Sequence, residues 1–303
     1  MPALGNESIY LKQYVRNLRG GSQPILARAS DGLLYVVKFI NNLQGPNLLF
    51  NESAGSELYG ACGLEVPEWK PLLLLDSFID GNPDCWIQTP EGRLRPAAGL
   101  CFGSRYLGGD GQRLIEFLPR ASFTRVRNQT SFWLAWLVDV CAGHTDNRQA
   151  IFVEDAERGL DACFVDHGHL FGGPNADQRK NFHVSAYLDS RIYKKLTAQD
   201  ALGLLDVIRA LDSDRLWQRV NTMPDNWRQA SALDGFQSAL DRLSKPLLVQ
   251  NVLNTIIDAH ERSTEEIQSR EPGRGWQPEL PVLRPEVRGT GSKRKSFGDF
   301  ACA

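Results

Sequence analysis

Two short stretches decide the fold: Gly143-His144-Thr145-Asp146-Asn147-Arg148-Gln149-Ala150-Ile151-Phe152 and Phe164-Val165-Asp166-His167-Gly168-His169. Each puts an acidic residue at the edge of an apolar run, and together they hold three of the five histidines. The first follows a predicted buried helix over 132–140, which places Asp146 in a loop. The second begins with a short apolar strand, so Asp166 is expected at a strand end, where Gly168 frees the backbone to turn.

An apolar run upstream carries a single lysine, Leu34-Tyr35-Val36-Val37-Lys38-Phe39. Burying an unpaired ammonium group is costly, so a lysine inside this strand needs an anionic partner. Glu52, at the start of the following predicted helix, is the first candidate, and Glu57 lies further along that helix. The alternative is an edge-strand lysine that points to solvent.

A glycine loop, Gly20-Gly21-Ser22-Gln23, precedes Lys38 between two predicted strands. Glycines let the backbone approach phosphate oxygens and direct several N–H groups at them. Many Gly-Gly pairs are plain turns, so the pair alone says little. Its position is informative, because a strand–loop–strand–turn–strand unit ending in a lysine is typical of the phosphate-covering hairpin of kinases.

The order of glycine loop, strand lysine, helix glutamate, loop aspartate and strand-end aspartate favours an ATP-dependent phosphotransferase. In such a site Lys38 holds phosphates, Asp146 orients the attacking hydroxyl and Asp166 binds magnesium. Arg148 would offset the charge of Asp146 or grip the transferred phosphoryl group. Asn147 and Gln149 could offer amide oxygens to the magnesium ion.

Composition excludes several other classes. A net charge of -2 gives no overall attraction to nucleic acid or to acidic membranes. No apolar run approaches the roughly 20 residues that span a bilayer, and the N-terminus lacks a signal core, so we expect a cytoplasmic protein. The six cysteines form no C-x-x-C pair, which predicts buried, reduced thiols.

The pattern along the chain predicts an α+β protein with a β-rich N-lobe over 1–107 and a helical C-lobe over 108–270. Strands are expected at 9–15, 25–29, 33–40, 72–75, 85–87 and 99–102, and helices at 51–63, 132–140, 197–211, 214–220, 227–243 and 246–266. Asn51 is the expected N-cap of the first helix. Residues 271–303 are rich in proline and glycine and are predicted to be a disordered tail. Its basic end could instead dock on an acidic partner.

These pieces together resemble the HipA-like kinases, distant relatives of eukaryotic protein kinases and of lipid kinases. The resemblance rests on 20–24, Val37-Lys38, Asn51-Glu52 with Leu64-Glu65-Val66-Pro67, and the two aspartate stretches. It implies a two-lobed protein-kinase-like fold, ATP and magnesium as cofactors, and a hydroxyl acceptor, most simply a protein Ser or Thr. It also implies that Gly99 to Leu107 connects the lobes beside the adenine.

The chain departs from the family at one position. Related enzymes place a metal-binding asparagine five residues after the catalytic aspartate, where this chain has Ile151. Three hypotheses therefore stay open: an active kinase, a nucleotide-binding pseudokinase or scaffold, and a metal-dependent hydrolase. The hydrolase would use His144, Asp146, Asp166, His167 and His169 as ligands or catalytic groups.

Overall fold

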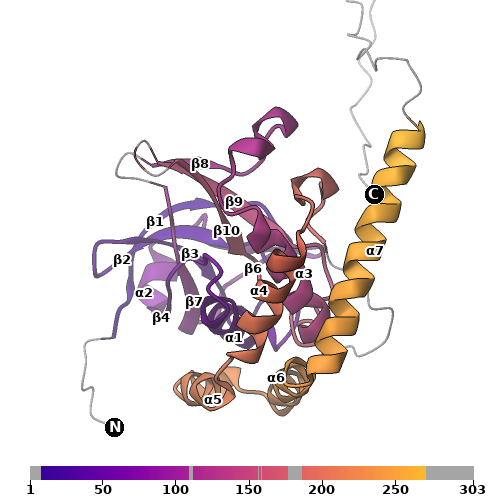
Figure 1. Ribbon diagram of the computed structural model, residues 1–303. Helices are drawn as coiled ribbons and strands as arrows, with labels where there is room; N and C mark the ends of the chain where they lie inside the picture. Colours follow the sequence, from indigo (N-terminus) through magenta and orange to yellow (C-terminus); the bar gives the residue numbers. More distant parts are fainter. Residues whose placement is uncertain (1–7, 109–111, 156, 158, 177–185, 271–303) are drawn as a thin grey trace, which may run out of the picture.

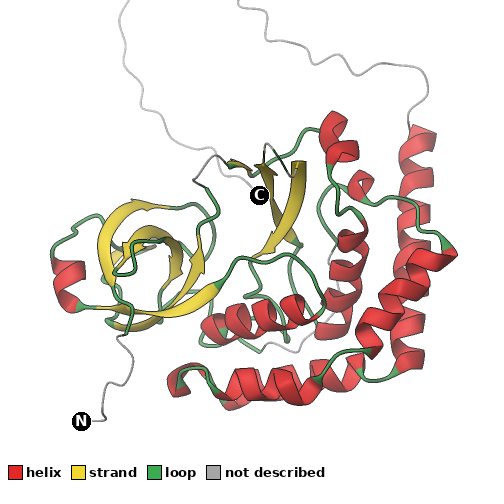
Figure 2. Cartoon of the chain, turned by 60° about the vertical axis from the view of Figure 1, so that its left-hand side comes forward, coloured by secondary structure: helices red, strands yellow, loops and turns green. Residues whose placement is uncertain are grey.

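The computed structural model describes residues 8–108, 112–155, 157, 159–176 and 186–270 (Figure 1). Strands gather at one end of the molecule and helices at the other, with a small second sheet between them (Figure 2). The chain thus has the expected β-rich half followed by a mainly helical half. The predicted disordered tail, 271–303, lies outside the described residues.

The N-terminal half is built on a five-stranded antiparallel sheet in the order β1-β2-β3-β7-β4. Its strands are β1 (Leu11–Asn17), β2 (Ile25–Ala29), β3 (Leu34–Lys38), β4 (Trp69–Leu74) and β7 (Gly99–Arg105). The predicted hairpin between β2 and β3 is confirmed, and Gly32 in its turn has φ +85°. A short helix, α2 (Asp76–Asp80), and a hairpin of β5 (Ile87–Thr89) and β6 (Gly92–Leu94) complete this half.

The expected inter-lobe connection over Gly99 to Leu107 is mostly wrong. Residues Gly99–Arg105 form β7, which lies between β3 and β4 inside the sheet. Alternating small and apolar residues suit this central strand, and Gly103 permits close packing because a Cβ there would lie 2.2 Å from Leu72 Cδ1. Only the residues from Tyr106 onward leave the sheet, so any connecting segment begins later than the sequence suggested.

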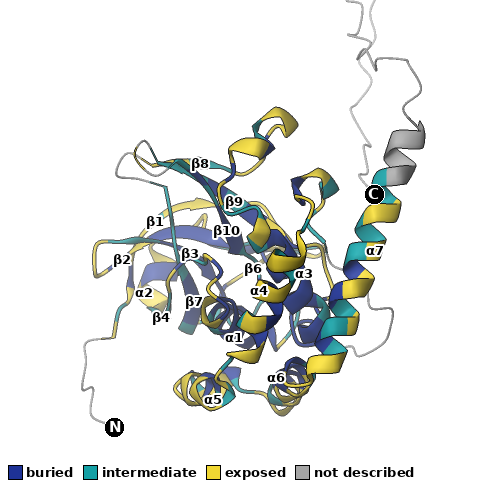
Figure 3. Cartoon of the chain, viewed as in Figure 1, coloured by how far each residue is buried: buried dark blue, intermediate teal, exposed yellow. Residues whose placement is uncertain are grey.

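The helix between β3 and β4, α1 (Leu48–Ala61), begins three residues earlier than predicted. Asn51 is therefore not its N-cap but an interior residue, 1% exposed. Its side-chain amide donates to the carbonyl oxygens of Gly168 and Leu170, both at 2.9 Å. Nearly the whole helix is buried, because the strands cover one side and C-terminal helices cover another (Figure 3).

The C-terminal half combines a three-stranded sheet with helices. The sheet holds β8 (Arg113–Ile115), β9 (Gln149–Asp155) and β10 (Gly159–Val165) in the order β10-β9-β8. The helices are α3 (Thr130–Ala142), α4 (Ala198–Arg209), α5 (Ser213–Asn221), α6 (Ala230–Leu243) and α7 (Pro246–Arg270), with 3-10 turns η1 (Arg120–Arg125), η2 (Ser190–Ile192) and η3 (Asp225–Trp227). Thr197 and Asp200 form a capping box at the start of α4.

One large apolar core joins the two halves and includes side chains of α1, α3, α6, β9 and β10. Helix α3 is apolar all round and lies at the centre of this core, which explains why a short segment could be recognised as buried from sequence. The five described cysteines are free and buried, as predicted. Within the described residues, none of the helices is both long and apolar enough to cross a membrane.

Two glycines of α1 give a test of this packing. An added Cβ at Gly55 would lie 2.5 Å from the Cβ of His167, whereas one at Gly60 would meet its first neighbour at 4.0 Å. We expect Gly55→Ala to destabilise the protein by about 1–3 kcal/mol through overpacking. Gly60→Ala should instead stabilise it by up to about 1 kcal/mol, because alanine favours an exposed helix position. Thermal unfolding of both variants checks this, and equal effects would contradict the close approach of α1 to His167.

Candidate functional site

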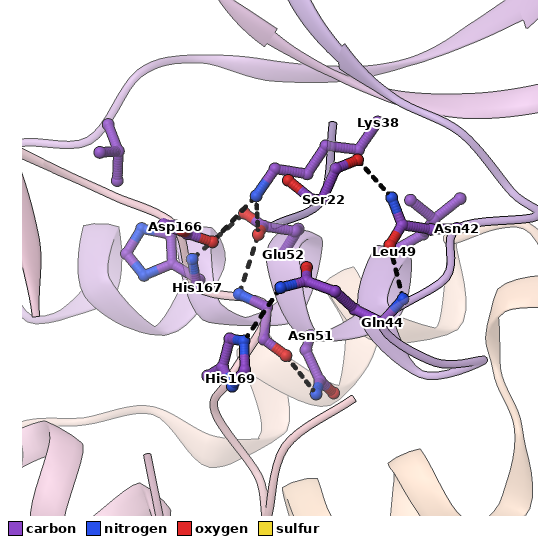
Figure 4. Close-up of polar contacts among 12 residues, drawn as sticks. Ser22, Lys38, Asn42, Gln44, Leu49, Asn51, Glu52, Asp166, His167 and His169 are labelled. Atoms are coloured by element: carbon purple, nitrogen blue, oxygen red, sulfur yellow. Dashed lines mark hydrogen bonds and ion pairs between the residues drawn. The ribbon is translucent and has the colours of Figure 1, made fainter. Parts of the chain in front are cut away.

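Three segments far apart in the sequence meet at the Lys38 side chain (Figure 4). Lys38 ends β3, is 6% exposed, and forms an ion pair with Glu52 of α1. Its Nζ also lies 2.9 Å from Oδ1 of Asp166, which follows β10 directly. The predicted pairing with Glu52 is confirmed, and the solvent-facing alternative is wrong. Glu57, the other candidate partner of Lys38, is instead paired with Arg219 at 2.8 Å.

Glu52 also binds the backbone that follows Asp166. Its carboxylate accepts the backbone N–H of His167 at 3.2 Å and that of Gly168 at 2.9 Å. Gly168 allows this approach, since a Cβ there would lie 2.8 Å from the Glu52 Oε1. Asp166 itself has φ +62°, a left-handed conformation that is uncommon for aspartate. The turn is thus held by α1, and it presents the Asp166 carboxylate to Lys38.

The two carboxylates of this cluster stabilise the Lys38 charge, although burial and the nearby Asp166 charge raise the pKa of Glu52. Burial alone would lower the pKa of Lys38, but the carboxylates of Glu52 and Asp166 outweigh it and hold that pKa above its usual value. Burial would likewise raise the pKa of Asp166, and the nearby Lys38 charge holds it well below the usual range instead. Both groups are therefore ionised at neutral pH.

The glycine loop connects β1 and β2, and Figure 4 draws its Ser22 close to Lys38. Gly20 has φ +130° and Gln23 has φ +44°, so the backbone turns sharply at both ends of the loop. Ser22 is 6% exposed, and its carbonyl oxygen accepts the side-chain amide of Asn42 at 2.6 Å. The Gln23 side chain makes two hydrogen bonds with the backbone of Gln88. Its Nε2 donates to the Gln88 carbonyl oxygen at 2.9 Å, and its Oε1 accepts the Gln88 N–H at 2.7 Å.

The loop that carries Asp146 lies between α3 and β9. Gly143, with φ +69°, ends the helix, and His144 turns inward, 4% exposed, with Nδ1 2.5 Å from the carbonyl oxygen of Asp146. The side chains of Asp146 and Asn147 are exposed, so they are available to solvent or a ligand. Burial lowers the pKa of His144 from 6.5 to about 4, which keeps the ring neutral.

Gln149 begins β9 and stands opposite Val165, the residue just before Asp166. Its side chain is exposed. Ile151, at the position where relatives carry asparagine, is two residues into the strand and opposite Cys163. On this strand Gln149 is the residue opposite the position just before Asp166, and Ile151 lies two positions further along.

Arg148 is not exposed beside Asp146 but buried, 2% exposed, under both loops. Its guanidinium donates to Asp139 through Nε at 2.8 Å and through one terminal nitrogen at 2.6 Å. The other terminal nitrogen donates to the carbonyl oxygens of Val165 at 3.0 Å and Asp166 at 3.3 Å. Each of the three nitrogens donates to a protein acceptor and the side chain is buried, so Arg148 is not placed to grip a transferred phosphoryl group.

Asp139 and Tyr59 complete this buried network, and sequence reasoning missed both roles. The Tyr59 hydroxyl donates to Asp139 Oδ1 at 2.6 Å, and its ring lies 4.7 Å from the Arg148 guanidinium carbon. The only signal was an aspartate inside an apolar helix, which requires a buried cation or donor as partner. Nothing local indicates which cation that is, since Arg148 lies nine residues away beyond a turn.

Oxygen donors of the site fit a hard cation better than a transition metal. In the described part of the chain, no three His, Cys, Asp or Glu side chains come together as metal ligands. His144 and His167 are buried in the core, and burial together with Arg148 holds the pKa of His167 well below its usual value. This contradicts the metal-hydrolase hypothesis, which needed a cluster of these side chains. The Asp166 carboxylate offers oxygen atoms of the kind that magnesium prefers, and Gln149 lies opposite the preceding residue, Val165.

Comparison with known proteins agrees with this geometry at the level of fold. No protein-family model and no curated protein matches the chain. The structure of the Helicobacter pylori proinflammatory kinase CtkA aligns with a TM-score of 0.54 at 12% identity, over 80% of this chain and 97% of that one. Two structures of the Golgi casein kinase, one with Mn and ADP bound, align at 0.48 and 12% identity, over 82% and 81% of this chain and 72% and 73% of theirs. The likeness to CtkA shows that this chain has a two-lobed, protein-kinase-like α+β fold.

The buried pair of Asp139 and Arg148 generates a stability prediction. Asp139→Ala leaves the guanidinium uncompensated, and we expect a loss of about 3–5 kcal/mol. Asp161→Ala is the control, because its partner Arg127 is 54% exposed and surface pairs contribute at most about 1 kcal/mol. Urea unfolding measures both. Equally small losses of unfolding free energy in the two variants would contradict a stabilising buried ion pair between Asp139 and Arg148.

His144 should make stability depend on pH. Its folded pKa of about 4 lies below the unfolded value of 6.5, so the unfolded chain binds the proton more tightly. Stability is then complete above pH 6.5 and falls as the pH drops toward 4, by about 3 kcal/mol from this group. His144→Asn cannot titrate, so its unfolding free energy should fall less steeply over this window. Identical slopes for the two proteins would contradict a neutral, buried His144.

Proposed function

We propose that this protein is an ATP- and magnesium-dependent kinase that transfers the γ-phosphoryl group to a hydroxyl acceptor. The observation that carries the proposal is the convergence of Lys38, Glu52 and Asp166 beneath a glycine loop. An ion pair of strand lysine and helix glutamate beside a metal-binding aspartate is the arrangement that protein kinases use for phosphoryl transfer. Together with the kinase fold, it supports an activity of the HipA-like type, with a protein Ser or Thr as the proposed acceptor.

Each residue then has a defined task. The backbone of Gly20, Gly21, Ser22 and Gln23 covers the phosphates, and Lys38, oriented by Glu52, donates to their oxygens. Asp166 binds magnesium, with Gln149 and Asn147 as further oxygen donors. Asp146, exposed at the end of its loop, accepts the proton of the acceptor hydroxyl. When bound, ATP with magnesium supplies the phosphoryl group and the positive charge that stabilises its transfer.

We assign Arg148 a positioning role in place of the catalytic one expected from sequence. Its backbone continues the Asp146 loop, while its guanidinium holds the carbonyl oxygens of Val165 and Asp166. One buried side chain thereby fixes the two loops relative to each other. Asp139 neutralises its charge, and Tyr59 ties the pair to α1.

The proposed partners are ATP and an unidentified hydroxyl-bearing protein or small molecule, with no nucleic acid and no membrane. A cytoplasmic location remains part of the proposal. The second candidate is an ATP-binding pseudokinase or scaffold, which Ile151 favours, since this chain lacks asparagine at that position. The two candidates share the nucleotide site and differ only in turnover.

Thermal unfolding with and without magnesium-ATP tests the site. At 100 times its dissociation constant, a ligand adds about 2.7 kcal/mol, a shift of a few degrees. We expect Asp166→Asn and Lys38→Met to lose this shift, and Asp161→Asn, the same change on the exposed side of β10, to keep it. Asp146→Asn should keep the shift but consume ATP at least about 100-fold more slowly.

The outcomes separate the candidates. No shift at millimolar ATP in the unsubstituted protein would refute both the kinase and the pseudokinase. A magnesium-dependent shift without ATP consumption or phosphoryl transfer would leave the pseudokinase as the function of this site.

A further inference from the structure

The segment between β3 and α1 crosses the proposed phosphate site and is fixed on both sides. Toward the glycine loop, Asn42 donates to the Ser22 carbonyl oxygen at 2.6 Å. Toward the chain after Asp166, Asn175 donates to the Gln44 carbonyl oxygen at 2.6 Å, and the Asn47 N–H donates to Pro174 at 2.9 Å. The segment therefore holds Gln44 in one place between the two halves of the site.

The Gln44 side chain lies between the glycine loop and His169 (Figure 4). A Cβ at Gly21 would be 2.8 Å from Gln44 Nε2, so the glycine loop packs closely against this amide. The same nitrogen lies 3.4 Å from His169 Nε2. At the other end of the amide, Oε1 is buried and has no hydrogen-bond partner among the described residues. The Gln44 side chain thus has one buried polar atom, Oε1, that lacks a hydrogen-bond partner among the described residues.

The orientation of the Gln44 side-chain amide is assigned from the hydrogen bonds around it. The oxygen and nitrogen of an amide are distinguished only by their hydrogen bonds, and a neutral imidazole has one donor and one acceptor nitrogen. The Thr145 hydroxyl lies 3.1 Å from His169 Nδ1 and 3.3 Å from the His169 carbonyl oxygen, and we assign its proton to Nδ1, which leaves Nε2 as the donor. Gln44 then presents its oxygen to His169. Its NH2 group takes the place of the unpaired oxygen and has no acceptor among the described residues.

The position of Gln44 indicates which phosphate of the nucleotide it would contact. Its partner His169 accepts the backbone N–H of Thr145 at 2.9 Å, and Thr145 directly precedes Asp146. Gln44 is therefore linked to the end of the site where Asp146 would meet the acceptor hydroxyl. Of the phosphates that the glycine loop would cover, the one nearest this end is the terminal one.

We propose that Gln44 binds the terminal phosphate of the nucleotide by donating its side-chain N–H groups, with His169 and Thr145 fixing the amide. The inference rests on the proposed function. It makes the β3–α1 segment a third wall of the phosphate site, beside the glycine loop and the Asp166 turn. Gln44 would then distinguish nucleoside triphosphates from diphosphates.

Calorimetric titration with a non-hydrolysable ATP analogue and with ADP, both with magnesium, tests the inference. Gln44→Leu removes the donors at similar size, and Gln44→Glu replaces them with a negative charge. We expect both to weaken binding of the ATP analogue by about tenfold or more, and ADP binding by less than about threefold. Gln218→Glu, the same charge change at an exposed position of α5, should alter neither.

Two results would overturn the inference. Equal losses for the ATP analogue and ADP would show that Gln44 does not read the terminal phosphate. Unchanged binding in both Gln44 variants would show that it does not contact the nucleotide at all. If the unsubstituted protein binds neither nucleotide, the proposed function itself fails, and this outcome is distinct from both.

Discussion

Burial of the Lys38 ammonium group is the constraint on which the rest of the structure depends. A charge that is 6% exposed is tolerated only when anions meet it, and here two do so, 14 and 128 residues further along the chain. Satisfying it brings α1 against β3 and the end of β10 against both. The two lobes are therefore joined at their most strongly charged point, which is also the candidate site.

Helix α1 carries this constraint into the C-terminal half. Asn51, Glu52, Gly55 and Tyr59 follow the spacing of one helix face, and each contacts the other half of the molecule. Asn51 and Glu52 bind the backbone around Gly168. Gly55 has no side chain, so His167 can pack directly against the helix backbone. Tyr59 reaches Asp139. This face is polar where a core helix is usually apolar, because it supplies the hydrogen bonds that a tight, partly left-handed turn cannot make for itself.

Much of the fold was accessible from sequence because its signals are local. The strand lysine, the hairpin turn and the apolar helix before Asp146 each fix a short stretch of chain. A buried lysine needs an anion, and Glu52 was the first candidate by its place in the sequence. The start of α1 was mispredicted because Asn51 has the composition of a cap but serves a distant backbone. The role of Arg148 was mispredicted for a similar reason. An arginine beside a loop aspartate has the same local sequence whether it faces solvent or the core.

The place of Gln149 shows why spacing rules borrowed from relatives fail when a loop changes length. Counting five residues from Asp146 reaches Ile151, already inside β9 and paired with Cys163. Counting instead from the strand pairing reaches Gln149, opposite Val165 and thus next to the residue before Asp166. A metal-binding side chain must satisfy distance to the ion, not separation along the chain. The position nearest to Asp166 on β9 is therefore set by the register of β9 and β10, and in this protein that register places Gln149 opposite Val165.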